Sequence, residues 1–223
     1  MKIRNGFVSN SSSSSFLVAF DNNAIPTTEQ EMHKLLFGST QDHPVTEYDY
    51  EASSMEMARK ALYDLQKQKK PLTFDQVLEE IRSGYFEGCI GTWDYEKHSE
   101  TGSKMYELEQ QYREKYKTEK DWIHSGKHPD DSLCIEYRKL RDKLYDEVKK
   151  INDETARKIA QKFWDDTMDP IGWELERISK EVAEKFAQKV YVFSYSDNNG
   201  SFGCLMEHWG IFNRLNHVTI SHH

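Results

Sequence analysis

Apolar runs that favour β-strands stand at the two ends of this chain, and a long charged stretch separates them. Residues 16–20 read Phe-Leu-Val-Ala-Phe, without polar alternation, which is typical of a strand covered on both faces. Near the other end, residues 190–195 read Val-Tyr-Val-Phe-Ser-Tyr and residues 218–220 read Val-Thr-Ile. A sheet built from these runs must bring the two ends of the chain together.

The C-terminal part also carries a hairpin signal. Residues 197–200 read Asp-Asn-Asn-Gly and lie between the run at 190–195 and a second apolar run at 202–209. Asn-Gly between two such runs is typical of a β-hairpin turn. The sequence therefore predicts an α+β fold with a small, mostly antiparallel sheet, made by the N-terminal strand and a C-terminal hairpin and packed by helices.

Amphipathic helices are predicted between the first strand and the middle of the chain. Thr28 with Glu31, and Thr73 with Gln76, have the spacing of a capping box, in which each residue of the pair satisfies a backbone N–H near the other. A further run of helical spacing lies between these two starts. Residues 85–95, rich in aromatic residues and glycine, leave strand and loop open.

The middle of the chain, from about residue 102 onward, is almost continuously helical in pattern. A polar break at 126–130 separates two charged helices, and the second has apolar residues at steps of three or four. We expect an antiparallel helical hairpin, placed at 102–165 as an insertion in a single domain that spans 1–223. The charged faces of these helices suit solvent, or binding of a protein partner.

Charge and cysteine content restrict the function classes. The net charge of −8, from 38 acidic and 30 basic side chains, argues against a protein that binds nucleic acid mainly through phosphate contacts. No apolar run reaches the roughly 18 residues that cross a bilayer, and serines stand where the apolar part of a signal peptide would lie, which predicts a cytoplasmic protein. Cys89, Cys134 and Cys204 are far apart in sequence, which favours reduced thiols over a disulfide framework.

The serine-rich segment before the first strand is the first candidate site. Successive backbone N–H groups and hydroxyls can hold an anion such as phosphate, with charge from a nearby arginine. A phosphate loop normally leads into a helix and this segment leads into a strand, so a tether, a processed or modified segment and a packed loop stay open. The candidate anion-binding residues are Arg4, Asn10, Ser11, Ser12, Ser13, Ser14 and Ser15.

The second candidate site is an acidic and imidazole cluster near the C-terminus. The candidate catalytic residues are Asp197, Glu207, His208 and His217, and the candidate ligands for zinc or another divalent metal are His208, His217 and His222. On a strand, Glu207 and His208 would face opposite sides, so at most one of them would join a given site. Exposed or packing histidines, and an acid–base site without metal, are the alternatives.

Two segments of the chain carry a resemblance. The opening from Arg4 to Phe16, Arg-Asn-Gly-Phe-Val-Ser-Asn followed by five serines and Phe, resembles the start of a group of uncharacterised phage and prophage proteins. The Ser-Asp-Asn-Asn-Gly segment that ends at Gly200, the Glu-His pair at 207–208 and the final Ser-His-His are similar to the C-terminus of some of them. The resemblance implies a viral accessory origin and assigns no catalytic residue.

Three functions follow as hypotheses. The first is a phage or prophage accessory protein, in the host cytoplasm, that binds a host or phage protein or a small anionic ligand through the sheet ends and the helical hairpin. The second is a small metal-dependent or acid–base hydrolase that uses the C-terminal cluster. The third, a structural virion component, would self-assemble. An enzyme requires the cluster to meet in one concave pocket, whereas a binding module leaves it scattered.

Overall fold

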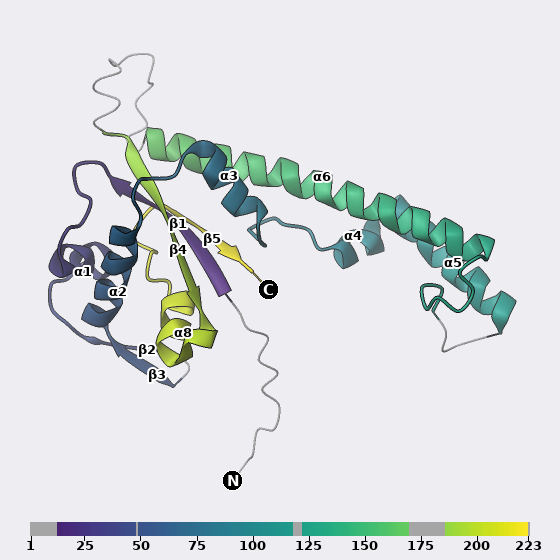
Figure 1. The fold of residues 1–223 in the computed structure, drawn as a ribbon, viewed down its shortest axis with the longest axis horizontal. Coiled ribbons are helices and arrows are strands. Elements are labelled where there is room, and N and C mark those ends of the chain that lie inside the picture. The colour runs from purple at the N-terminus through teal and green to yellow at the C-terminus, as the bar shows by residue number, and fades with distance from the viewer. Residues whose placement is uncertain (1–12, 48, 118–121, 170–185, 223) are drawn as a thin grey trace, which may run out of the picture. The chain divides into compact units, whose positions relative to one another are not determined.

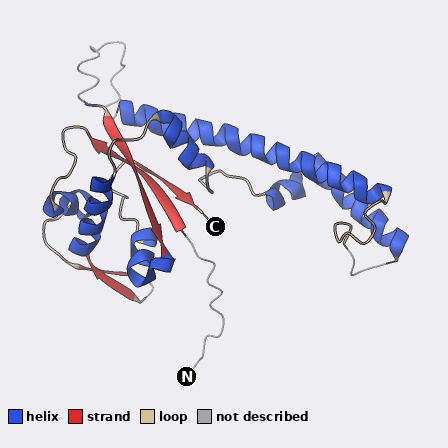
Figure 2. Cartoon of the chain, viewed as in Figure 1, coloured by secondary structure: helices blue, strands red, loops and turns tan. Residues whose placement is uncertain are grey.

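A computed structural model describes residues 13–47, 49–117, 122–169 and 186–222 of the chain (Figures 1 and 2). The helices and strands of the described residues are, in chain order, β1 (Ser13–Asp21), α1 (Glu29–Phe37), β2 (Pro44–Glu47), β3 (Tyr50–Ser53), α2 (Ser54–Lys67), α3 (Phe74–Arg82), α4 (Thr92–His98), α5 (Glu100–Tyr116), α6 (Ser132–Met168), β4 (Gln188–Ser196), the short 3-10 helix η2 (Asp197–Asn199), α8 (Gly200–His208) and β5 (His217–Ser221). The α+β class predicted from the sequence is confirmed.

The chain divides into two compact units. Unit 1 contains the described residues of Met1–Glu87 and Ala156–His223, and unit 2 is Gly88–Thr155. Helix α6 contributes residues to both units. The expected description, one domain with residues 102–165 inserted, stays a prediction. Unit 2 begins at Gly88 and ends at Thr155, so each of its bounds lies earlier in the chain than the corresponding bound of the predicted insertion.

Strand β1 lies at the centre of the sheet in unit 1, between two strands from the other end of the chain. The strand order is β4-β1-β5, and both pairings are antiparallel. Phe16 stands opposite Phe193 on one side and Thr219 on the other. The prediction that the terminal runs pair in one sheet is therefore confirmed. The cause is the unbroken apolar run at residues 16–20 of β1, because such a run must be flanked and covered.

The core of unit 1 fills the side of the sheet that faces α1, α2 and α8. Because side chains alternate along a strand, Phe16, Val18 and Phe20 share this side, with Phe193 opposite Phe16 on β4. The other side includes Leu17 and Ile220, which are also fully buried. Gly84, just past α3, lies against the Ile220 side chain. Both sides of the sheet are thus covered, as the apolar pattern of β1 predicts.

The prediction of a C-terminal hairpin in this sheet is wrong. Residues 200–208 form helix α8, so the expected C-terminal hairpin is absent from the described chain, and β5 is the third strand of the sheet. Leu205 and Met206 bury one side of α8 in the core. Gly203 permits this packing, because a Cβ atom there would lie only 2.1 Å from the carbonyl oxygen of Ser196. Tertiary packing has overridden a local β-type signal. A hairpin that the sequence did not indicate, β2-β3, lies elsewhere in unit 1.

The predicted helix starts are confirmed at the atomic level. The Thr28 hydroxyl accepts a hydrogen bond from the backbone N–H of Glu31, whose carboxylate accepts one from the N–H of Thr28. Thr73 and Gln76 do the same at the start of α3. These reciprocal bonds satisfy N–H groups that a helix start otherwise leaves without partners.

Unit 2 contains α4, α5 and the first part of α6. Thr101, at the start of α5, donates a hydrogen bond of 3.1 Å to Glu147, whereas Tyr116, at its end, donates one of 2.5 Å to Asp131. The two helices therefore run antiparallel, which confirms the predicted helical hairpin. Its core consists of Met105, Leu108, Tyr112, Ile123, Cys134, Tyr137 and Leu144.

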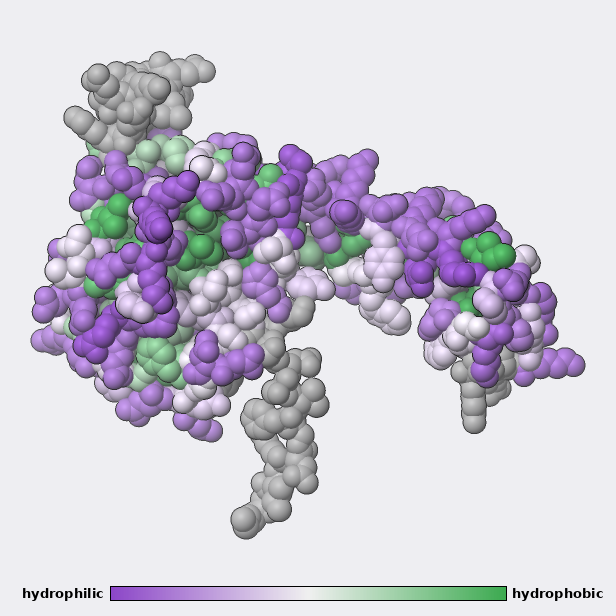
Figure 3. Space-filling view, viewed as in Figure 1, coloured by the Kyte–Doolittle hydropathy of each residue, from purple (hydrophilic) through white to green (hydrophobic). Residues whose placement is uncertain are grey.

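The segment that the sequence left open, residues 85–95, is resolved in favour of loop and helix. It makes a single β-bridge, between Tyr85 and Ser221, before α4 begins. Hydrophilic residues cover most of the visible surface of each unit (Figure 3). Among the described residues, no helix combines the length and the apolar character required to cross a membrane.

Candidate functional site

Ser14 of β1 and Glu207 of α8 form the centre of a polar cluster in unit 1. The Ser14 hydroxyl donates a hydrogen bond of 2.9 Å to Oε1 of Glu207, and the backbone N–H of Asp197 donates one of 3.1 Å to Oε2. The Glu207 side chain is 0% exposed. A buried carboxyl group requires partners for both oxygens, and here it has them. Glu207 therefore joins β1, η2 and α8.

His208 lies beside this carboxyl group. Its Nε2 is 3.7 Å from Oε2 of Glu207, and its side chain is 37% exposed. The expectation that Glu207 and His208 face opposite sides of a strand is wrong, because both belong to helix α8. The structure thus brings together Asp197, Glu207 and His208 from the predicted catalytic set, with the buried carboxyl group of Glu207 between the other two.

The two remaining histidines lie elsewhere. His217 stands opposite Val18, four residues along β1 from Ser14, which corresponds to about 13 Å of strand. Its Nδ1 lies 3.1 Å from the carbonyl oxygen of Leu215. The Nε2 of His222 lies 2.9 Å from the hydroxyl of Ser15. His208, His217 and His222 therefore do not converge, and the part of the chain that the structure describes contains no group of three His, Cys, Asp or Glu arranged to hold a metal.

The residues of the first candidate site divide into those outside and those inside the part of the chain that the structure describes. Arg4, Asn10, Ser11 and Ser12 lie outside the described residues. Ser13, Ser14 and Ser15 belong to strand β1, not to a loop. The Ser15 hydroxyl lies 3.0 Å from that of Ser194 on β4 as well as close to His222, so both buried serine hydroxyls, Ser14 and Ser15, have partners within the sheet or on α8. Ser14 and Ser15 therefore lie beside an acidic group, Glu207, and an imidazole group, His222, from the C-terminal part of the chain.

A second polar network, which sequence reasoning missed, joins the buried side chains of His33 on α1 and Ser54 at the start of α2 to the exposed Asp42. The Nε2 of His33 lies 2.7 Å from the hydroxyl of Ser54, and this hydroxyl lies 3.1 Å from Oδ1 of Asp42. The three residue types match a hydrolytic triad, but Ser54 is fully buried and at the beginning of a helix. Because the Ser54 side chain is not exposed to solvent and already has hydrogen-bond partners, we interpret the network as structural. Hydrogen bonds from Ser53 and from the N–H of Met55 lower the pKa of Asp42 to about 2.

A hollow with exposed aromatic walls lies in unit 2. It is a cavity of 890 Å³ between α4, α5, the loop before α6 and α6 itself. Trp93, Tyr106 and Trp122 border it and are 67%, 64% and 50% exposed, and Tyr137 forms its floor. Gly102 allows α5 to pack closely against α4, because a Cβ atom there would lie 1.7 Å from the carbonyl oxygen of Glu96.

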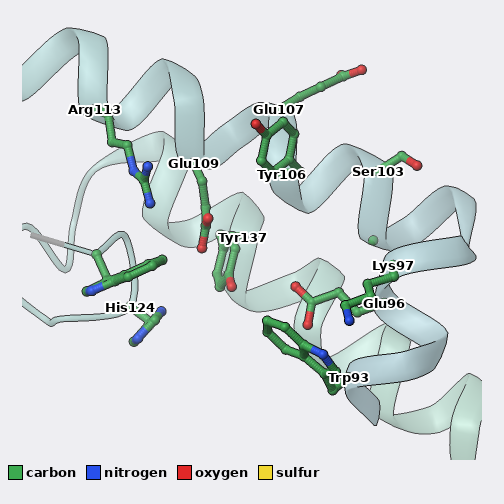
Figure 4. A pocket seen from close by; sticks show the side chains of 12 residues that line it. Trp93, Glu96, Lys97, Ser103, Tyr106, Glu107, Glu109, Arg113, His124 and Tyr137 are labelled. Carbon is green, nitrogen blue, oxygen red and sulfur yellow. The ribbon is translucent and has the colours of Figure 1, made fainter. Parts of the chain in front are cut away.

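Charged side chains are interleaved with these rings. Figure 4 shows Glu96 and Glu109 turned toward Tyr137, with Trp93 beside Glu96. Burial raises the pKa of Glu96, and the charge of Glu109 adds to this effect. Burial, with the carboxylates of Glu109 and Glu96, also raises the pKa of Tyr137, to about 12. The carboxyl groups of Glu96 and Glu109 therefore share a partly buried environment.

Two cations of the chain already lie against the tryptophans. Lys97 Nζ is 4.8 Å from the centre of the Trp93 ring, and the guanidinium carbon of Arg113 is 4.9 Å from that of Trp122. The sequence had a signal for this site. Trp93, Glu96 and Lys97 are spaced by three or four residues on one helix, and Tyr106, Glu109 and Arg113 repeat the pattern on the next. Each set therefore lies on one face of its helix.

Comparison with protein-family models, with curated proteins and with solved structures finds no match to this chain. Function must therefore be argued from the two sites. The cluster around Glu207 is buried and held by hydrogen bonds, whereas the cavity of unit 2 is open to solvent and lined by exposed aromatic and charged side chains.

Proposed function

We propose that this chain is a phage or prophage accessory protein that binds a host or phage protein in the host cytoplasm, and that unit 2 carries the binding surface. The observation that supports the proposal is the group of exposed rings, Trp93, Tyr106 and Trp122, around one cavity. Exposed aromatic residues cost solvation free energy in the free protein, and they dominate the energetics of protein interfaces. The phage-like opening of the chain supports the proposed origin.

The state of the Glu207 cluster favours binding over hydrolysis. A general base or nucleophile must reach the substrate, and Glu207 is fully buried with both oxygens hydrogen-bonded. A small anion is also a poor ligand for Ser14, because the hydroxyl already donates to a carboxyl group. The distance of His217 from the other candidates points the same way.

The experiment uses the full chain, immobilised and exposed to host lysate. Proteins that it retains are identified, purified and titrated against the chain by calorimetry. We expect a double variant, Trp93→Ala with Trp122→Ala, to bind the purified partner at least about tenfold more weakly, because truncation of a central aromatic residue at an interface typically costs about 2 kcal/mol or more. Tyr145→Ala is the matched control, since Tyr145 is an exposed ring of unit 2 that does not line the cavity.

Two results would overturn the proposal. Equal affinity of the double variant and the wild type for every purified partner would exclude the cavity as the binding surface. Failure of the wild-type chain to bind any protein in purified form would exclude the binding function itself. Circular dichroism of the double variant establishes that a loss of binding is not a loss of fold.

A further inference from the structure

Three carboxylates line the cavity of unit 2, and Figure 4 shows Glu107 turned away from Glu96 and Glu109. Among the described residues, neither Glu96 nor Glu109 forms an ion pair with a lysine or arginine. The two cations that also line the cavity, Lys97 and Arg113, lie over tryptophan rings instead. Close carboxylates in a partly buried place repel each other, and a cation between them would relieve this repulsion.

The aromatic rings beside these carboxylates suit a cation of a particular kind. Trp93 lies next to Glu96, and Tyr137 lies between the two carboxylates (Figure 4). A metal ion prefers oxygen or nitrogen ligands on every side, whereas an organic cation is attracted to the face of an aromatic ring. The chain shows this chemistry itself, since the Arg113 guanidinium lies over the Trp122 ring.

We propose that the cavity of unit 2 binds the guanidinium group of an arginine side chain on the partner protein, held between the Glu96 and Glu109 carboxylates and stacked on the neighbouring aromatic rings. This inference rests on the proposed function and names the group that the binding surface recognises. A guanidinium fits better than an ammonium, because it is planar, stacks on aromatic faces and presents several N–H donors in one plane to carboxylates. The acidic net charge of the chain, −8, favours a basic partner.

The test uses the full chain and small probes. N-acetyl-arginine amide carries the proposed group, and N-acetyl-citrulline amide has the same shape without the charge. Nuclear magnetic resonance spectra of the indole N–H groups report on the site, because Trp93 and Trp122 line the cavity and Trp164 and Trp209 do not. We expect the arginine probe to shift the Trp93 and Trp122 signals in a saturable way, and the citrulline probe to leave every indole signal unchanged.

Charge variants test the carboxylates directly. We expect Glu96→Gln and Glu109→Gln each to weaken binding of the arginine probe about tenfold, the loss typical of one charge-assisted hydrogen bond. Glu114→Gln, an exposed carboxylate of α5 that does not line the cavity, is the matched control and should bind as the wild type does. Equal binding of the arginine and citrulline probes, or equal affinity of all three variants, would overturn the proposal.

The outcomes separate this inference from the proposed function. If Trp93→Ala with Trp122→Ala loses a purified partner but the arginine probe leaves the indole signals unchanged, the guanidinium site is wrong and the binding function stands. If the arginine probe binds but no protein partner does, the protein-binding function is wrong. Tetramethylammonium chloride is the third probe, and tighter binding of this ion than of the arginine probe would replace the arginine side chain by a small organic cation.

Discussion

Replacement of Ser14 by alanine tests the structural role of the Ser14–Glu207 pair. The variant removes the donor of a buried 2.9 Å hydrogen bond and leaves Oε1 of Glu207 without it. Hydrogen bonds to a carboxylate contribute about 1.5–3 kcal/mol, and an orphaned buried acceptor costs a similar amount. We therefore expect the free energy of unfolding to fall by about 2 kcal/mol. For a chain of this size, that corresponds to a decrease in Tm of about 4–8 °C.

The assay is thermal and urea unfolding followed by circular dichroism. Ser201→Ala is the control, because Ser201 is exposed on α8 and its replacement should change the unfolding free energy by less than about 0.5 kcal/mol. A double-mutant cycle with Glu207→Gln isolates the pair, and we expect a coupling free energy of about 1 kcal/mol or more. If Ser14→Ala and Ser201→Ala unfold alike and the cycle is additive, the cluster does not hold the fold together. Glu207 would then again be a candidate catalytic residue.

Two further predictions concern single side chains. We expect Gly102→Ala to separate α4 from α5, because a Cβ atom would meet the carbonyl oxygen of Glu96; the arginine probe should lose binding while the circular dichroism of the chain stays helical. Unchanged binding would show that the cavity does not depend on this close approach. Asp42 has a pKa lowered to about 2, so its hydrogen bonds stabilise the fold above the unfolded value near 4 and are lost as the pH falls through 2. We expect Asp42→Asn to reduce the loss of stability between pH 4 and pH 2, and identical acid unfolding curves would contradict this.

The sheet could be predicted because one short apolar run in the sequence is enough to require a neighbouring strand on each side. The run at residues 16–20 has no polar side, so it had to be flanked, and clear apolar β-type runs stood at the far end of the chain. Helix α8 could not be predicted in the same way. Its apolar residues follow an Asn-Gly turn signal, and the helix is accompanied by burial of Leu205 and Met206 and by the close approach of Gly203 to Ser196, which the local pattern does not reveal.

The candidate sites, like the sheet, could be predicted from the sequence only in part. The pairing of the chain ends predicts that Ser14 lies near the C-terminal acidic residues, and it does, but the burial of Glu207 depends on α8 being a helix. The cavity of unit 2 requires α4 to fold back on α5, and no local pattern specifies that angle. The spacing of Trp93, Glu96 and Lys97 marks a helix face, but it does not reveal a hollow beside it.

The central position of β1 has a consequence for synthesis on the ribosome. Strand β1 precedes both of its neighbours, β4 and β5, in the chain, and helices α1 to α6 lie between them. The nascent chain must therefore carry an unpaired apolar segment until β4 and β5 have emerged, and such segments attract chaperones and other nascent chains. Unit 2 is continuous in sequence, so it can fold before β1 has paired with its neighbours. We expect the protein to be most vulnerable to aggregation before β4 and β5 have emerged from the ribosome.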